Sequence, residues 1–307
     1  MNNARVDPRR LELLLELSRL GSMRAVADVM HVTTSTVSQQ IAALAREVGT
    51  PLLEPAGRHV RLTPAGRRLA DHAVTILAAI EAARLDLDPA AAPSGTVRVA
   101  AFASAVREAL LPVVGTLADR HRDVGLLIHE YEPAEALALL VADDVDLALT
   151  YDYNLAPATF ERGLEAWPLW ERPWGLGVPS AQRVDGGNAL AVFARFGDHD
   201  WIINSRNTAD EETVRTVASL AGFRPRIVHR ADSLELVEDM IVAGLGVGML
   251  PTGRRGAPGV ALCPLRDPDV RLRAYAVARR GRTDWPPLAL VLRMLRQPSP
   301  SPHEEPC

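Results

Sequence analysis

Two short helices joined by a tight turn are predicted over residues 21–49, and this helix pair constrains the N-terminal fold more than any other segment. Ser22 and Thr33 are placed to cap the two helices, because each hydroxyl can accept a hydrogen bond from a free backbone N–H group. In the second helix the apolar residues between positions 37 and 48 recur every three or four positions, which predicts one buried stripe. Beside that stripe lie short hydrogen-bonding side chains that would let the helix approach another surface closely: Thr34, Ser35, Ser38 and Gln39.

This layout is typical of a helix-turn-helix, whose second helix lies in the DNA major groove with its N-terminal residues against base edges. An ordinary helix pair with a solvated polar side gives the same pattern, so the flanking segments decide between them. Asp7 and Pro8 begin a preceding helix that completes a three-helix core, and residues 52–62 predict a hairpin with a basic tip, which is a wing. The residues predicted to contact bases or phosphates are Thr33, Thr34, Ser35, Ser38, Gln39, Arg58, His59 and Arg61.

A long helix is predicted from residue 64 to about residue 87, with Thr63 as its cap and Pro64 as its first residue. Its apolar residues fall at helical spacing, and we expect the small domain to leave this stripe uncovered. An exposed apolar stripe usually pairs with its own copy, so the sequence predicts a homodimer. The residues expected at the dimer interface are Leu69, Ala73, Ile76, Ile80 and Leu87.

The charge distribution fits a nucleic-acid reader joined to a different module. The formal net charge is −4, yet residues 1–70 hold ten arginines against six acidic residues. Cys263 and Cys307 are too few for a disulfide framework, and the histidines lack metal-ligand spacing, so we expect neither metal nor cofactor. No apolar run could cross a membrane, and residues 1–10 lack the apolar core of a secretory signal, which predicts a cytoplasmic protein.

Strands and helices alternate over residues 96–297, which predicts an α/β domain with a parallel sheet. A proline- and alanine-rich linker, residues 89–95, precedes it, and residues 298–307 have the composition of a disordered tail. The domain has no nucleophile elbow and no phosphate-binding loop, and its glycine-rich segment 244–248 follows a helix, the reverse of a dinucleotide-binding order. Three acidic residues between a helix and a strand are interpreted as a solvated turn: Asp143, Asp144 and Asp146.

Polar residues at the strand ends of this domain predict a ligand site. Ser104 follows the first strand, where a helix N-terminus would attract an anion; it could also cap that helix, and the two roles are compatible, with ligand binding favoured. Arg206 also favours a small carboxylate ligand, whereas Asp152 would favour an amine if it faced inward. The predicted ligand-binding residues are Ser104, Thr150, Tyr151, Asp152, Asn204 and Ser205.

Residues 8–90 resemble the N-terminal domain of the LysR-type transcriptional regulators. The similarity includes the glycine-serine turn, the threonine-capped helix with its VSQQI run, the hairpin, and the LTPAG start of the long helix. The family usually has arginine where Gln39 stands, and a phenylalanine-glutamate-arginine run at residues 53–55. The segments DHDWII and AGFRPRIVHRADSLELVEDMIVAGLGVGMLP resemble the effector-binding domain of the same family.

The resemblance implies an α+β winged helix-turn-helix (residues 1–63), a dimerisation helix (64–88) and a hinge linker (89–95). It also implies a two-lobed α/β effector domain with the type 2 periplasmic-binding-protein fold, in which two crossing strands join the lobes. Lobe I would comprise about residues 96–169 and 265–297, and lobe II about residues 170–264.

The function implied by the resemblance is transcription regulation rather than catalysis. The partners would be double-stranded DNA, further copies of the chain in a homodimer or homotetramer, and a small-molecule effector, with carboxylates common among relatives. Two alternatives remain open. One is a metabolite-binding protein that has lost DNA binding, and the other is an enzyme on a solute-receptor-like fold.

Overall fold

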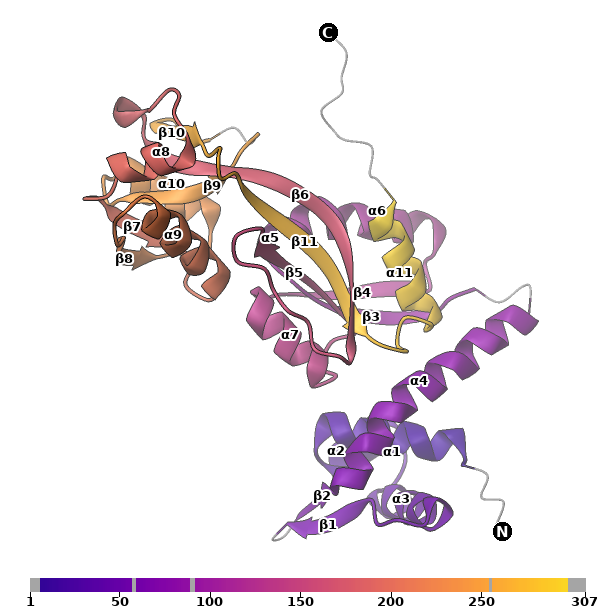
Figure 1. The fold of residues 1–307 in the computed structure, drawn as a ribbon. Coiled ribbons are helices and arrows are strands. Elements are labelled where there is room, and N and C mark those ends of the chain that lie inside the picture. Colours follow the sequence, from indigo (N-terminus) through magenta and orange to yellow (C-terminus); the bar gives the residue numbers. More distant parts are fainter. Residues whose placement is uncertain (1–5, 57–58, 89–91, 254–255, 298–307) are drawn as a thin grey trace.

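The computed structural model describes residues 6–56, 59–88, 92–253 and 256–297. A small domain and a larger α/β domain are joined by the long helix α4 (Figure 1). The small domain consists of α1 (Pro8–Leu20), α2 (Met23–Val29), α3 (Thr34–Val48), the hairpin β1 (Leu53–Ala56) and β2 (His59–Leu62), and the start of α4 (Pro64–Leu87).

Local signals in the sequence set the ends of these helices. The side chains of Asp7, Ser22 and Thr33 each accept a hydrogen bond from a backbone N–H in the first turn of the helix that follows. Gly21 and Gly49 end α1 and α3 in the left-handed conformation, which glycine adopts without a steric penalty. The predicted helix starts and ends in this domain are therefore confirmed.

The core of the small domain forms where the three helices meet the wing. Leu14, Val37 and Ile41 are fully buried there. Gly66 in the first turn of α4 allows the close packing, because a Cβ atom at this position would lie 2.3 Å from the carbonyl oxygen of Leu52. The first turn of α4 consequently packs closely on the segment that leads into the wing.

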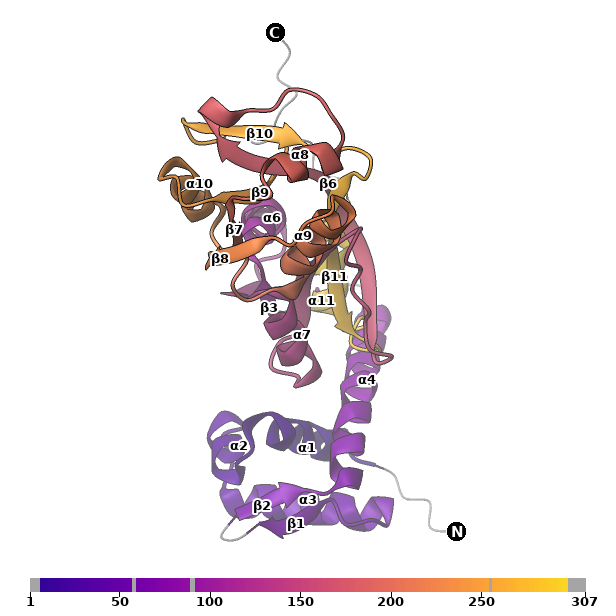
Figure 2. The ribbon, with the colours of Figure 1, turned by 60° about the vertical axis from the view of Figure 1, so that its left-hand side comes forward.

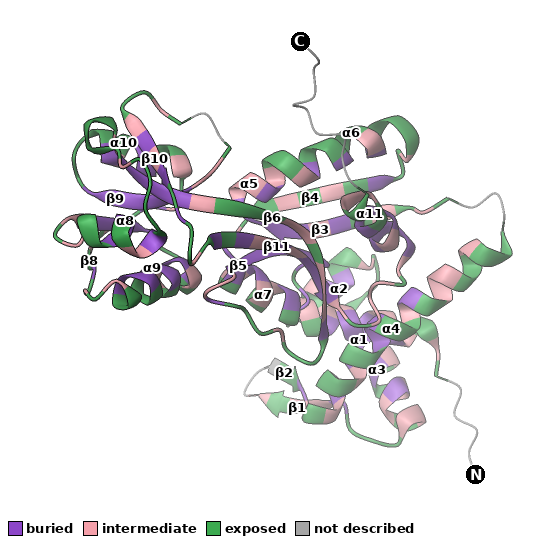
Figure 3. Cartoon of the chain, turned by 45° about the horizontal axis from the view of Figure 1, so that its top comes forward, coloured by how far each residue is buried: buried purple, intermediate pink, exposed green. Residues whose placement is uncertain are grey.

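The first half of α4 packs on α1, and this corrects part of the dimerisation prediction. Ala73 is completely buried in the core of its own domain, and Leu69 packs against that core. Both were expected to lie in an uncovered stripe, but α1 covers them. Ile76 and Leu87 are 41% and 85% exposed, and Ile80 is half-buried, so the uncovered apolar positions of the predicted stripe lie in the second half of the helix, which carries exposed residues in Figure 3.

Nine strands of the described residues form one curled mixed sheet in the α/β domain, in the order β4-β3-β5-β11-β6-β9-β7-β8, with β10 paired to β6. The strands are β3 (Gly95–Ala101), β4 (Val124–Glu130), β5 (Leu147–Tyr153), β6 (Leu164–Pro179), β7 (Asp200–Ile203), β8 (Arg226–Arg230), β9 (Val247–Pro251), β10 (Val260–Pro264) and β11 (Val270–Arg279).

The sheet passes through two lobes, and β6 and β11 run from one lobe to the other (Figure 1). Strands β3–β5 are mutually parallel in lobe I and β7–β9 are mutually parallel in lobe II, as predicted, but β6, β10 and β11 pair antiparallel. Helices cover the sheet faces: α5 (Ala103–Ala105), a π-helical segment (Val106–Leu110), α6 (Leu111–Arg120), α7 (Pro133–Val141) and α11 (Pro286–Arg296) in lobe I, and α8 (Ala189–Arg195), α9 (Thr208–Leu220) and α10 (Leu234–Val242) in lobe II.

The two domains meet at an interdomain ion cluster formed by Arg19, Asp71, Asp143 and Arg279. Arg19 at the end of α1 donates to Asp143 Oδ2 at 2.5 Å, and Arg279 at the end of β11 pairs with the same carboxylate. Asp71 of α4 lies 3.8 Å from Arg279. Figure 2 shows α4 rising from the small domain to this side of the α/β domain.

The predicted solvated turn at residues 143–146 is wrong for two of its three carboxylates. Asp143 and Asp146 are 6% and 2% exposed, whereas Asp144 is exposed as expected. Asp146 accepts from Arg98 and Arg282, each at 3.0 Å. These arginines are distant in sequence, so the local pattern of acids could not indicate that the turn is buried and neutralised.

Candidate DNA interface and effector cleft

The N-terminal part of α3 presents an exposed polar face. Thr33 Oγ1 accepts the backbone N–H of Thr36 at 3.1 Å and therefore caps the helix. Figure 2 shows α3 and the β1–β2 hairpin at the end of the molecule farthest from the α/β domain. The exposed side chains along this face are those predicted from sequence: Thr33, Thr34, Ser35, Ser38 and Gln39.

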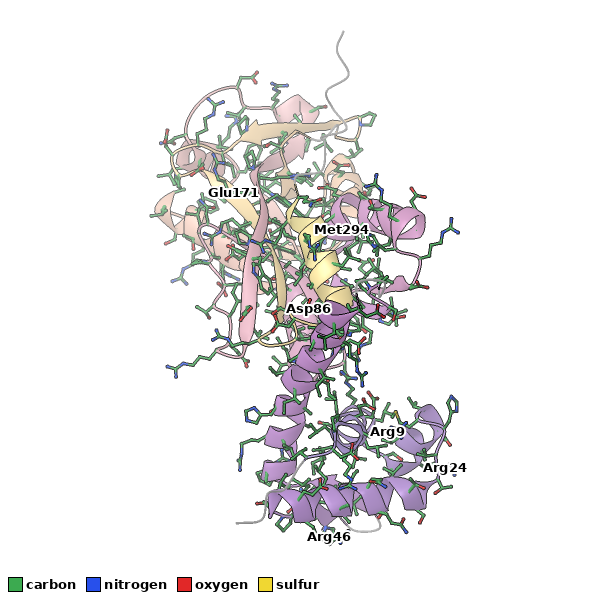
Figure 4. All side chains as sticks on the ribbon, turned by 90° about the vertical axis from the view of Figure 1, so that its right-hand side faces the viewer. Arg9, Arg24, Arg46, Asp86, Glu171 and Met294 are labelled. Atoms are coloured by element: carbon green, nitrogen blue, oxygen red, sulfur yellow. The ribbon has the colours of Figure 1, made fainter. Side chains whose placement is uncertain are left out.

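Only one of the three basic side chains predicted on the wing can be described, namely Arg61. Arg61 is exposed, but its Nε lies 2.7 Å from Glu54 Oε1 on the opposite strand, so its charge is partly satisfied. Arg58 and the side chain of His59 lie outside the described residues, and their predicted contacts stay predictions. Sequence reasoning missed Arg46, which lies two turns after Gln39 on α3 and is exposed on the outer side of that helix (Figure 4).

A cavity of about 200 Å³ lies between the two lobes. Ser104 and Tyr151 of lobe I and Asn204 of lobe II line it, as predicted. Ser104 does not cap α5, because Phe102 occupies the cap position and no side-chain cap bond forms there. Of the two compatible roles for Ser104, only the ligand-facing one keeps a structural basis.

The other three predicted residues do not line the cavity. On β5, Thr150 and Asp152 alternate with Tyr151 and Tyr153, and only the tyrosines face the cavity, because successive side chains point to opposite faces of a strand. Asp152 instead accepts from Arg273 at 2.8 Å. Ser205 is not part of the lining, but its hydroxyl donates at 2.6 Å to Asp232, which is.

Two buried carboxylates line the cavity without having been predicted. Glu132 accepts from the Tyr151 hydroxyl at 2.8 Å and from the Asn204 amide at 3.4 Å. Asp210 accepts from the Asn204 backbone N–H at 2.9 Å and from the Tyr153 hydroxyl at 3.2 Å. Burial raises the pKa of Glu132 above its ordinary value and raises the pKa of Asp210 to about 6.

Ion pairs connect the lobes at the mouth of the cavity. Arg107 of lobe I lies 2.9 Å from Glu235 of lobe II. Arg206 of lobe II lies 3.3 Å from Glu135 of lobe I and 2.7 Å from Asp232 of its own lobe. The relative position of the lobes is therefore held partly by contacts that can exchange with water.

Neither a metal site nor a membrane span is found in the described part of the chain. No group of three histidine, cysteine, aspartate or glutamate side chains there is placed to hold a metal ion. No described helix has the length and apolar character needed to cross a bilayer. Cys263 is buried, its Sγ accepts from the Val184 N–H at 3.4 Å, and burial raises the pKa of the thiol.

A winged helix-turn-helix with an exposed polar face on its second helix, joined to two lobes that enclose a cavity, is the architecture of a ligand-responsive DNA-binding protein. Residues 8–67 match the family model described as "Bacterial regulatory helix-turn-helix protein, lysR family". Residues 90–299 match the model described as "LysR substrate binding domain". The chain belongs to the LysR family of transcriptional regulators. Its promoter binding is modulated by an effector bound between the α/β lobes.

Individual relatives are distant in sequence but extend over most of the chain. The nitrogen assimilation regulatory protein nac of Escherichia coli K12 is 27% identical over 247 residues, which cover 79% of this chain and 77% of the relative. A hydrogen peroxide-inducible genes activator of Escherichia coli O6:H1 is 26% identical, covering 93% and 94% of the two chains. The structure of a full-length OxyR variant from Pseudomonas aeruginosa has a TM-score of 0.68 at 19% identity and covers 96% of this chain and 99% of its own.

Proposed function

We propose that the Thr34–Gln39 face of α3 contacts base edges while Arg46 and the wing bind the DNA backbone. The exposure of this polar face, at the end of the molecule remote from the α/β domain, is the observation that supports this assignment. Short hydroxyl and amide side chains can hydrogen-bond to bases in the major groove, and arginine suits phosphate. DNA binding then resides in residues 1–63, followed by the dimerisation helix, and no residue has a catalytic role.

Alanine at both Ser35 and Ser38 is expected to reduce the preference for the natural site over other sequences, by about 1–3 kcal/mol for each base contact that is lost. Arg46→Ala is the matched contrast, because loss of a phosphate contact weakens binding to all sequences and lowers the salt slope by about one unit. Mobility shifts on the DNA upstream of the gene, against a scrambled duplex, measure both effects. Unchanged site preference in the double variant would show that α3 does not recognise bases.

We also propose that the second half of α4 pairs with its copy in a homodimer, and that homodimers associate into the tetramer implied by the family resemblance. The exposed positions Ile76 and Leu87, with the half-buried Ile80, support the first step. The contact would bury apolar surface that the chain itself leaves in water. The protein would act in the cytoplasm, where promoter DNA is accessible.

Glutamate at both Ile76 and Ile80 is expected to give monomers in sedimentation, because pairing would bury unpaired charges at the interface. Leu220→Glu is the control, since Leu220 is 60% exposed on α9, far from α4 in the chain. Loss of the dimer should also lower DNA affinity, because a monomer cannot bind two half-sites at once. A double variant that sediments as the wild type would exclude this surface.

Effector binding would change DNA binding by changing the relative position of the two lobes. The ion pairs at the cavity mouth hold lobe II against lobe I, and the interdomain ion cluster ties lobe I to α1 and α4. A ligand shifts such an arrangement only by its difference in affinity for the two states, typically about 1–3 kcal/mol. This route predicts that ligands able to alter lobe closure alter DNA binding.

Peroxide sensing, suggested by the name of one relative, has little support in this chain. Cys263 is the one cysteine of the described residues, and a buried thiol with a raised pKa is a poor nucleophile because the thiolate is the reactive form. A bound metabolite is the better-supported signal. The same exposed α3 face argues against the alternative of a metabolite-binding protein that has lost DNA binding.

A further inference from the structure

The cavity between the lobes has an excess of negative charge. Arg107 is the one basic residue in its described lining, and its guanidinium is already paired with Glu235 at 2.9 Å. Five acidic side chains line the same cavity: Glu130, Glu132, Asp210, Asp232 and Glu235. Arg206 lies beside Asp232, and even when it is counted with Arg107, the acidic side chains outnumber the basic ones.

The two most enclosed acids have only neutral donors. Glu132 and Asp210 are 4% and 7% exposed, and their hydrogen bonds come from tyrosine hydroxyls and from Asn204. No salt bridge within the described ranges of the chain joins either carboxylate to a cation. A buried carboxylate without a direct ion pair is costly, and burial raises the pKa of both groups accordingly.

An aromatic wall completes the cavity. Phe102, Tyr151, Tyr153 and Trp174 follow one another edge to face, with ring centroids 4.8, 6.2 and 5.4 Å apart along the series. All four rings line the cavity. These rings give the cavity an apolar wall beside the carboxylates, which suits a ligand that has both an apolar body and a charged group.

We propose, resting on the effector-binding function above, that the effector is a small organic cation whose ammonium group lies against Glu132 and Asp210. The cavity volume of about 200 Å³ limits the ligand to a small metabolite, since pockets for drug-sized ligands span roughly 300–1,000 Å³. The small carboxylate predicted from sequence would add an anion beside buried acids. The described lining offers no unpaired arginine to receive it.

Calorimetry on the full-length chain with three four-carbon probes tests the charge of the ligand. Butane-1,4-diamine, butane-1,4-diol and succinate share one chain length and differ in the charge of their end groups. The diamine is expected to bind at least about tenfold more tightly than the diol, because charge-assisted hydrogen bonds are stronger than neutral ones, and succinate is expected not to bind. Equal or tighter binding of the diol or succinate, or no binding of the diamine, overturns the inference.

The substitutions Glu132→Gln and Asp210→Asn test whether the diamine binds at these two carboxylates. Each keeps the shape of the side chain and removes its charge, so diamine affinity should fall at least about tenfold. Glu212→Gln, an exposed acid on α9, is the matched control and should leave the affinity unchanged. Thermal unfolding of each variant confirms folding, and wild-type affinity in both cavity variants would place the diamine elsewhere and overturn the inference.

A ligand-free mobility shift on the upstream DNA separates this inference from the function on which it rests. A chain that binds its DNA but no diamine contradicts the cationic effector alone. A chain that binds the diamine in the cavity but no DNA contradicts the regulatory function and leaves the cation site standing.

Discussion

Replacing Asp146 by alanine is expected to lower the free energy of unfolding of the α/β domain by about 3–5 kcal/mol. The carboxylate is 2% exposed and accepts hydrogen bonds from Arg98 and Arg282, each at 3.0 Å. Its pKa lies below the ordinary value because these arginine contacts outweigh the effect of burial. Removing it would leave Arg282, which is enclosed by the protein and stacks on Trp285, without its counter-charge.

Urea unfolding monitored by tryptophan fluorescence measures this loss. Asp144→Ala provides the control, because Asp144 belongs to the same turn but is exposed, and its effect should stay within about 0.5 kcal/mol. Asp146→Asn should fall between the two, since an amide can still accept one arginine hydrogen bond. A loss of less than about 1 kcal/mol in Asp146→Ala would mean that water solvates the two arginines in place of the carboxylate.

Asp210→Asn is expected to stabilise the protein at pH 7 and to change how stability depends on pH. Because burial raises the pKa of Asp210 to about 6, the unfolded chain releases this proton at lower pH than the folded chain does. The contribution of Asp210 to stability is therefore greatest below about pH 4, falls as pH rises to about 6, and is constant above that, with a total loss of about 3 kcal/mol. Asparagine has no proton to release, so this loss disappears.

The asparagine side chain can keep both hydrogen bonds of Asp210. Its oxygen can accept from the Asn204 backbone N–H, and its amide can donate to the Tyr153 hydroxyl. The measurement is the difference between the two stability curves from pH 4 to pH 7, which removes the contributions of all other acids. A difference that does not grow over this range would show that Asp210 is ionised in the folded protein at low pH.

The cost of keeping Asp210 and Glu132 in the cavity marks it as a functional surface. Glu132 on the loop before α7 and Asp210 on α9 have neutral hydrogen-bond donors in place of a stabilising ion pair. In contrast, Asp143 and Asp146 are buried with arginines on both sides. Buried charge thus has direct arginine partners at Asp143 and Asp146, whereas the two cavity carboxylates have no direct ion pair where a ligand can enter.

Sequence alone determined what local interactions control. The caps at Ser22 and Thr33 and the terminal glycines of α1 and α3 satisfy backbone groups within a few residues, so their effect is visible in the pattern. The exposed face of α3 follows in the same way from helical periodicity. Family motifs added the two-lobed architecture, which the matching domain descriptions support.

Tertiary structure alone decided which side chains share the cavity. Strand alternation makes Tyr151 and Asp152 face opposite sides, but only the position of β5 between β3 and β11 decides which side is the cavity. The burial of Asp143 and of Ala73 likewise depends on partners from distant segments, namely Arg279 and α1. Charge neutralisation and coverage of an apolar face are long-range properties, because they require groups that come together only when the chain has folded.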